Sequence, residues 1–158
     1  MKWVTRERPK IDRLACPWLI QRFIDPKAEI LYVPPGEVLS VAERHDAIPF
    51  DVPGVELTHS GPLCSFDAFL AKYRLDDTGL ARLASIVRAA DTDTLDESRE
   101  APGLLAISLG LGINIRDDQE LLAAARVVYD ALYAWCSSGQ RERHGWNPDA
   151  IRATMART

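Results

Sequence analysis

The fold class follows from one continuous stretch, WVTRERPKIDRLACPWLIQRFIDPKAEILYVPP, which spans residues 3–35. Its opening residues, WVT, are a candidate for a short strand. Its closing residues, AEILYVPP, form a compact apolar run ended by two prolines, which also indicates a strand. A helical pattern separates the two. The order strand, helix, strand predicts a small, largely parallel sheet covered by helices.

The helical pattern covers residues 12–25, in which Leu14, Trp18 and Phe23 recur at roughly helical spacing. Pro17 lies inside this pattern. Because proline has no amide hydrogen, Pro17 must occupy the first helical turn or kink the helix. We therefore expect a helix that either begins close to this residue or is disturbed there.

Two further extended segments follow, DAIPFDV at residues 46–52 and VELTH at residues 55–59. Both are interpreted as short strands or extended segments. Pro49 and Pro53 indicate sheet edges, because proline cannot donate a hydrogen bond to a central ladder. The sheet is therefore expected in the N-terminal third of the chain.

The remainder of the chain is predicted to be helical, which makes the fold class α/β with a helical C-terminal half. Each expected helix begins at a residue type that favours a helix N-terminus. The expected helices run from Ser65, as its cap, to Tyr73; from Thr78, as its cap, to Ala90; over 101–111, opened by Pro102; over 118–136, opened by Asp117 or Asp118; and onward from Asn147-Pro148.

Length and composition limit the class of protein. The 158 residues are enough to bury a core, and we expect a single domain over residues 1–158. Hydrophobic residues at 47% and charged residues at 27% argue against disorder. There is no run of ~20 apolar residues and no signal peptide, so no membrane is expected. Cys16, Cys64 and Cys136 form no CxxC pair, which indicates reduced thiols in the cytoplasm.

The net charge of −4 is unevenly distributed. Residues 1–27 hold seven Lys or Arg and three acidic residues, so their balance is +4 and the remainder sums to −8. An acidic chain with one basic segment is a poor general nucleic-acid binder. The basic segment is either a patch that holds a small anion or a solvated face.

A group of metal-competent side chains surrounds one turn in residues 55–73, VELTHSGPLCSFDAFLAKY. Glu56, His59, Cys64 and Asp67 offer oxygen, nitrogen and sulfur ligands, which suit zinc or a similar divalent metal. Their spacing matches no standard zinc finger. The alternative is that His59 is a hydrogen-bonded structural residue and that Asp67 stabilises the first turn of its helix.

A second pair of acids, Asp91 and Asp93, directly follows an apolar helix. The helix dipole disfavours negative charge at a helix C-terminus, so these acids need compensation. A metal ion or an arginine would supply it. The alternative is that both are solvated in an acidic loop.

A third group, Asp12, Arg13 and Cys16, lies where the first strand gives way to a helix. In an open parallel sheet this is the crevice where ligands bind. Arg13 and Arg22 are candidates to hold a tetrahedral oxyanion through paired N–H donors, and Cys16 beside arginines would have a lowered thiol pKa. The alternative is that Asp12 caps the helix and Cys16 packs in the core.

These residues also carry a family resemblance. The segments 8–34, 46–70, IVRAADTD at 86–93 and VYDALYAWC at 128–136 resemble the C-terminal domain of the chromate-resistance ChrB family, from Trp3 to about Cys136. The resemblance implies a role in chromate response or resistance. Full-length members have a preceding N-terminal region associated with regulation, so we expect no DNA-binding repressor role from this domain alone.

A weaker resemblance concerns the order of motifs in DHH-type phosphoesterases. In those enzymes, acidic residues and a histidine-bearing turn assemble a manganese site at strand ends. Asp12, Asp51, His59 and Asp91 fall in that order here. The resemblance implies a similar site only at the level of fold analogy.

Together these patterns predict a ChrB-type domain that binds a divalent metal (zinc or manganese) or an oxyanion in one crevice. Asp12, His59 and Asp91 are each expected at a junction between an element and a loop. If the strands are parallel, the loops after them open at one sheet edge, so these three side chains should lie within roughly 10 Å of one another.

Two alternatives remain open for the function. One is a metal-dependent hydrolase of a small phosphorylated compound, in which the metal activates water. The other is a structural or partner-binding module. The expected partner is a small-molecule anion, and homo-oligomerisation stays open. The expected crevice is lined by Asp12, Arg13, Cys16, Glu56, His59, Cys64 and Asp91.

Overall fold

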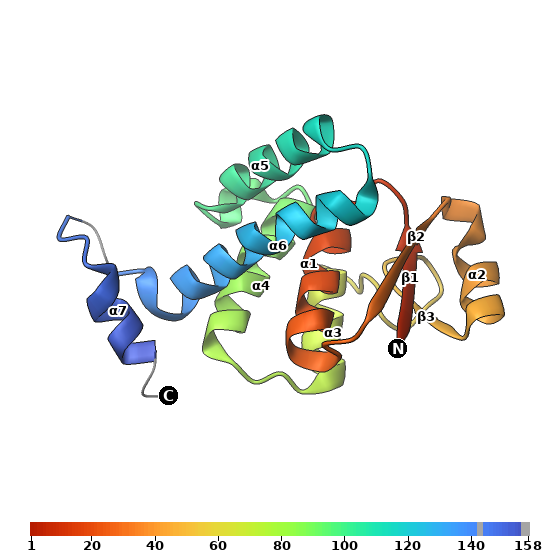
Figure 1. The fold of residues 1–158 in the computed structure, drawn as a ribbon, viewed down its shortest axis with the longest axis horizontal. Coiled ribbons are helices and arrows are strands. Elements are labelled where there is room, and N and C mark those ends of the chain that lie inside the picture. The colour runs from red at the N-terminus through yellow and green to blue at the C-terminus, as the bar shows by residue number, and fades with distance from the viewer. Residues whose placement is uncertain (142–143, 156–158) are drawn as a thin grey trace.

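Three parallel strands form the sheet in the computed structural model, which describes residues 1–141 and 144–155. β1 (Lys2–Arg6) lies between β2 (Glu29–Val33) and β3 (Ala47–Pro49), and both neighbours pair with it in parallel (Figure 1). The small parallel sheet predicted in the N-terminal third is confirmed. Pro49 ends an edge strand, where its missing N–H costs no ladder bond.

Helices make up most of the rest, as the α/β assignment predicted. Short non-α helical segments lie between them: η1 (Ile20–Ile24, π-helical), η2 (Pro35–Glu37), η3 (Leu95–Glu97) and η4 (Trp135–Gly139, π-helical). The α-helices are α1 (Asp12–Leu19), α2 (Val38–His45), α3 (Ser65–Tyr73), α4 (Thr78–Asp91), α5 (Ala101–Asn114), α6 (Asp118–Ala134) and α7 (Pro148–Met155).

Residues 55–59, predicted to be a short strand or an extended segment, do not form a strand. This segment belongs to an irregular loop between β3 and α3. Gly54 turns the chain with a left-handed φ of 85°, and the Leu57 carbonyl then accepts a hydrogen bond from the Asp51 amide at 2.8 Å. The backbone therefore folds back on itself instead of adding to the sheet.

Side chains alternate between the two faces of the sheet, as the period of a strand requires. Trp3 and Ile30 pack into the main core with α1, α3, α4, α5 and α6. Val4 and Ala47 face the opposite way and pack against α2. Helices thus cover both faces of the sheet, with α2 alone on one side (Figure 1).

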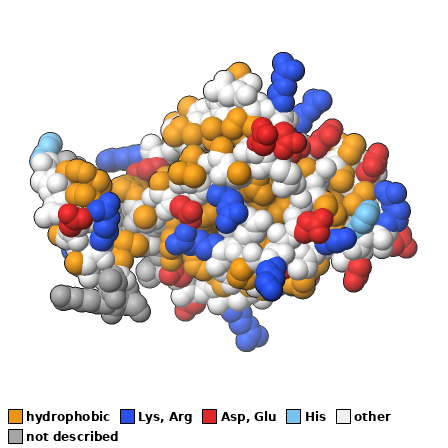
Figure 2. Space-filling model, viewed as in Figure 1, with side chains coloured by type: hydrophobic (Ala, Val, Ile, Leu, Met, Phe, Trp, Pro, Cys, Tyr) orange, Lys and Arg blue, Asp and Glu red, His pale blue; other side chains and the backbone are white. Residues whose placement is uncertain are grey.

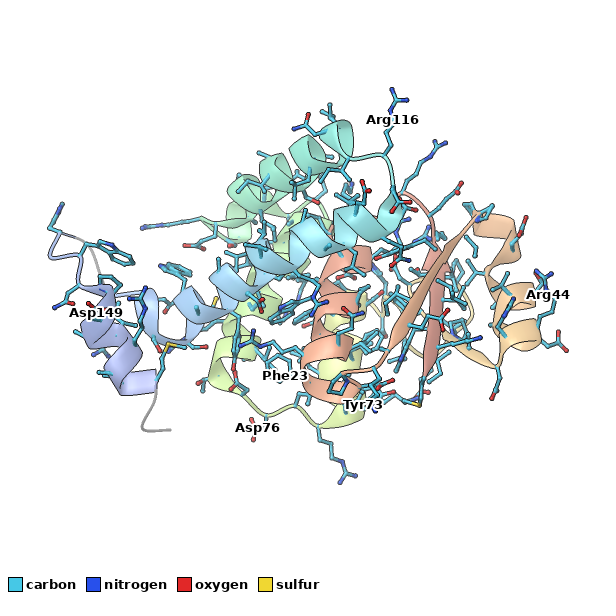
Figure 3. The ribbon with its side chains drawn as sticks, viewed as in Figure 1. Phe23, Arg44, Tyr73, Asp76, Arg116 and Asp149 are labelled. Carbon is cyan, nitrogen blue, oxygen red and sulfur yellow. The ribbon has the colours of Figure 1, made fainter. Side chains whose placement is uncertain are left out.

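Charged side chains cover the outer face of α2. Lys, Arg, Asp and Glu side chains gather at that end of the molecule (Figure 2). Arg44 projects from α2 away from the sheet (Figure 3). At the opposite end, α7 lies against η4, far from the sheet (Figure 1). Within the described residues, none of the helices has both the length and the apolar character needed to span a bilayer.

Pro17 sits in the middle of α1, and the helix widens into the π-helical turn η1 just after it. The carbonyl four residues earlier, that of Arg13, therefore loses its usual helical donor. The hydroxyl of Tyr32 on β2 donates to this carbonyl instead, at 2.7 Å. A hydrogen bond between helix and sheet replaces one that the helix cannot make.

Two helix starts agree with the sequence, and two others differ from it by one residue. Asp117, one of the two residues expected to open α6, caps it by accepting from two backbone amides. Asn147 precedes Pro148, the first residue of α7, and accepts from the Ala150 amide. The caps of α3 and α4 are Cys64 and Asp77, so the expected caps Ser65 and Thr78 are the first helical residues. Ser65 is drawn inward because its hydroxyl donates to a buried carboxylate.

Candidate metal centre

Four elements deliver titratable side chains to the carboxyl edge of the sheet. Asp12 is the first residue of α1 and follows the loop after β1, and Asp51 lies just past the end of β3. Asp91 ends α4, and His59 comes from the loop before α3. Because β2 and β3 lie on opposite sides of β1, the ends of β1 and β3 flank a switch point, where parallel sheets bind ligands.

His59 lies at the centre of this group. Its Nε2 is 2.9 Å from a carboxylate oxygen of Asp91 and 3.4 Å from oxygens of both Asp12 and Asp51. One ligand atom each from Asp12, His59 and Asp91 lie within 4.8 Å of one another. The predicted convergence of these three residues is confirmed, although His59 reaches the edge from an irregular loop and not from a strand.

Asp12 is the most deeply buried member, with 2% of its surface exposed. Its Oδ2 accepts from the Ser65 amide at 2.6 Å, whereas its Oδ1 is buried without a hydrogen-bond partner among the described residues. Burial, together with the nearby charges of Asp91 and Asp51, raises the pKa of Asp12 to about 6. A buried carboxylate with a free oxygen is a group that a cation would stabilise.

The histidine supplies positive charge to the group when no metal is bound. The hydrogen bond to Asp12, followed by the negative charges of Asp12, Asp91 and Asp51, raises the pKa of His59 to about 9. His59 is therefore protonated at neutral pH in this arrangement. Its side chain is 40% exposed, so it is open to exchange with solvent.

Asp91 receives compensation of a kind that the sequence did not suggest. Burial raises its pKa, and nearby negative charge adds to this effect. Its Oδ1 accepts from the Asp12 amide at 3.2 Å, and its Oδ2 faces His59. In the structure this helix-terminal acid contacts a histidine and a backbone N–H, so it is not simply solvated in an acidic loop.

Asp51 differs from Asp12 and Asp91 because it pairs with two arginines. Its Oδ2 is 2.9 Å from Arg6 and 3.4 Å from Arg13, and its Oδ1 accepts from the Ser65 hydroxyl at 2.7 Å. Asp51 also adopts a left-handed backbone, with φ of 53°. Non-glycine residues in this conformation are uncommon and often lie at functional sites.

The crevice beside these residues is a cavity of about 330 Å³, which Lys10, Thr58 and Pro53 line together with the group described above. Arg13 lines it too, but its Nη1 donates to the backbone carbonyls of Arg6 and Glu7. Burial lowers the pKa of Arg13. Its donors are therefore largely used to hold the β1–α1 loop in place.

Two predicted metal ligands are not brought into the group. Glu56 is exposed and pairs with Lys72 of α3. Cys64 is buried, but its Sγ lies 3.4 Å from Asp67 as part of the α3 cap, and burial raises its pKa. Both side chains are engaged by α3, which begins directly after the turn.

Two predicted oxyanion ligands are also placed elsewhere. Cys16 is fully buried in the core, and the lowered thiol pKa expected for it is wrong, because burial raises that pKa well above its usual value. Arg22 lies on η1, where it pairs with Asp130 of α6 and stacks 5.1 Å from the ring centroid of Tyr133. Of the predicted oxyanion ligands, only Arg13 lines the crevice.

The family can be assigned from the sequence comparison. The sequence model described as "ChrB, C-terminal domain" matches residues 3–136. The chain belongs to the ChrB C-terminal domain family. It is also 38% identical over 141 residues to Protein ChrB of Cupriavidus metallidurans. That alignment covers 89% of this chain but 42% of the relative's length, and no solved structure matches the chain.

All four members of the edge group lie inside the part that matches the ChrB C-terminal domain. Asp51 entered the sequence interpretation only through the order of phosphoesterase motifs. Arg6, Lys10 and Ser65 were not predicted to line or support the site. The position of Ser65 beside Cys64 at a helix start was a usable signal, because such hydroxyls often bond to nearby polar groups.

Proposed function

We propose that this ChrB C-terminal domain binds one divalent metal ion through Asp12, His59 and Asp91. The supporting observation is the convergence of their ligand atoms within 4.8 Å, with a buried oxygen of Asp12 left unpartnered among the described residues. Arg6 and Arg13 both pair with Asp51, so Asp12 and Asp91 are the two carboxylates of the group that have no arginine partner. A cation bound between them would supply the positive charge that they lack.

The ligand types narrow the choice of metal. Two or three carboxylates and one imidazole suit manganese or zinc better than a soft ion that prefers thiolates. The histidine must be neutral to bind, so the metal takes the place of the proton that His59 carries in the free protein. Asp51 is close enough to support or complete the ligand set.

The association of the ChrB family with chromate gives the proposed site a biological context. We propose a role for the domain in chromate response or resistance. A bound metal would present an open face to the crevice, where a small dianion such as chromate can approach. Lys10 is the cation best placed to assist, because it forms no ion pair with any described residue, while the donors of Arg13 are already occupied.

Elemental analysis of the purified protein tests the metal proposal. Wild type dialysed against manganese or zinc should retain about one equivalent, and His59→Ala should retain little. His45→Ala is the matched control, since His45 is an exposed residue at the end of α2. Equal metal content in His59→Ala and wild type would remove His59 from the proposed site.

A second function is favoured by the position of Asp51 with the other three residues at the strand ends. A metal bound there would lower the pKa of a bound water, so the domain would act as a hydrolase on a small phosphorylated compound. Manganese-dependent hydrolysis of p-nitrophenyl phosphate by wild type and His45→Ala, but not by His59→Ala, would support it. If wild type hydrolyses this probe with manganese no faster than His59→Ala does, the hydrolase function is excluded for this probe.

A further inference from the structure

A second cavity of about 480 Å³ lies on the other side of the β1–α1 loop from the candidate metal centre. Residues 8–10 of the loop form one wall, and the C-terminal half of α5 with the start of α6 forms the other. A volume of this size is typical of pockets for small organic ligands. Lys10 lines both cavities, so the loop separates them.

The α5 side of this cavity is apolar. The helix contains no charged residue along its whole length, Ala101–Asn114. Leu109 and Ile113 line the cavity and are 47% and 80% exposed. Apolar side chains form a continuous band over α5 on the surface (Figure 2). A helix that is apolar on its outer face normally has something packed against it.

The rim of the cavity is basic. Arg8, Lys10 and Arg116 line it, and none of the three forms an ion pair with a residue that the structure describes. Arg116 projects from the connection between α5 and α6 (Figure 3). The acid at the rim, Asp118, accepts a hydrogen bond from the Arg8 amide at 3.0 Å. One carboxylate beside three cations leaves net positive charge at the opening.

A buried hydroxyl adds an independent sign of a missing ligand. Ser108 lines the cavity from α5 and is 5% exposed. Its Oγ has no hydrogen-bond partner within residues 1–141 and 144–155. Buried hydroxyl groups are nearly always bonded, so this one calls for an acceptor or donor that the described residues do not provide.

We propose that this cavity binds a small organic anion with an apolar body, such as a medium-chain carboxylate. The apolar body packs on Leu109 and Ile113. The charged group pairs with Arg8 and Arg116 at the rim, and the Ser108 hydroxyl donates to a ligand oxygen. This site uses residues outside the proposed metal ligands and does not depend on metal binding.

The charge requirement is tested by calorimetric titration of octanoate and of octanol, its uncharged analogue, into wild type. Octanoate should bind more tightly than octanol. Arg8→Ala and Arg116→Ala should each weaken octanoate by up to about fivefold and leave octanol unchanged, as expected for an exposed ion pair. Equal affinity for octanoate and octanol would overturn the assignment of an anion.

The location is tested with two glycines of α5. A side chain added at Gly112 enters the lined cavity, while one at Gly103 on the same helix lies outside it; neither meets an atom within 4 Å. Leucine is also a better helix former than glycine, so both variants should fold. Gly112→Leu should lose octanoate binding, and Gly103→Leu should keep it. Unchanged binding by Gly112→Leu would overturn the site.

Two further results separate this proposal from others. His59→Ala should bind octanoate as wild type does, so a failed metal proposal leaves this one standing. Light scattering should show that the apolar band does not pair with a second copy of the chain over the concentrations used. The opposite result would be a dimer that Gly112→Leu abolishes and that octanoate disrupts. It would show that the surface serves self-association, and it would overturn the ligand proposal.

Discussion

Asp67 of α3 and Asp12 of α1 accept hydrogen bonds from adjacent backbone amides at the start of α3, yet their other neighbours differ. The Cys64 amide donates to Asp67, and the Ser65 amide donates to Asp12. Asp67 also receives two hydrogen bonds from Arg88, at 2.9 and 2.8 Å, and both of its oxygens are occupied. Asp12 has one buried oxygen without a partner among the described residues and faces further carboxylates.

The pKa values of the two acids diverge accordingly. Burial alone would raise the pKa of Asp67, but the hydrogen bonds from Arg88 and Cys64 hold it below its usual value. The pKa of Asp12 is instead raised to about 6, because burial is not offset by an arginine. A buried acid with a complete set of donors maintains the fold, whereas a buried acid that lacks donors is suited to bind an exchangeable cation.

The largest expected difference between the two acids is in metal affinity. Asp12→Asn removes a proposed ligand and should weaken manganese or zinc binding at least about 100-fold, whereas Asp67→Asn should bind as wild type does. Isothermal titration of both variants measures this. A similar loss of metal affinity in the two variants would show that the difference between the two acids does not reflect cation binding.

The second difference is in stability at pH 7 without metal. Asp67→Asn breaks a two-point contact with Arg88 and part of the α3 cap, so the free energy of unfolding should fall by about 2 kcal/mol. Urea unfolding of metal-free protein gives the value. Arg152→Gln, which disturbs an exposed ion pair in α7, is the control and should change little.

The third difference appears in the acid range. Because the pKa of Asp67 is lowered on folding, its contribution to stability is complete above its ordinary pKa near 3.8 and is lost as pH falls through the lower folded value. The gap between wild type and Asp67→Asn should therefore stay constant from neutral pH to about pH 5 and narrow below pH 4. A gap at pH 3 as large as the gap at pH 7 would show that the charge of Asp67 does not carry its effect.

The smallest effect is expected at Asp12 in the metal-free protein. Asparagine keeps an oxygen for the Ser65 amide and removes a buried charge, and His59 keeps Asp91 as a charge partner at 2.9 Å. Asp12→Asn should therefore change the free energy of unfolding by less than about 1 kcal/mol. The same urea series measures it. A loss of stability as large as that of Asp67→Asn would show that Asp12, like Asp67, mainly stabilises the fold.

Much of the fold could be predicted because its signals are local. The apolar runs around Trp3 and Ile30, Pro102 in the first turn of α5 and the Asp117 cap each act within a few residues. Residues 55–59 were expected to be a short strand or an extended segment because their composition is typical of a strand. No strand forms there, because Gly54 and the Asp51–Leu57 hydrogen bond fold the segment into a loop. Composition alone does not reveal such a contact.

Only the part of the site that depends on the position of the strand ends could be predicted from the sequence. Asp12 lies at the carboxyl edge of the sheet because it follows β1, whereas Asp91 reaches that edge as the last residue of α4 and His59 reaches it from the loop before α3. Arg22 was misplaced because its partner, Asp130, lies 108 residues further along the chain. Likewise, the burial of Cys16 comes from tertiary packing that no short motif encodes. Metal binding itself stays a prediction.

The hydrogen bond between Tyr32 and the Arg13 carbonyl has a consequence for how this sequence can vary. Pro17 leaves that carbonyl free, next to the residue that begins the site, and the Tyr32 hydroxyl takes it. A phenylalanine at position 32 would leave the carbonyl without a donor for as long as position 17 is proline. Position 32 depends on position 17, but position 17 does not depend on position 32. Any residue other than proline at position 17 would have an amide N–H to donate to the Arg13 carbonyl, so the tyrosine would no longer be needed. Among relatives, loss of the tyrosine should therefore follow loss of the proline and not precede it.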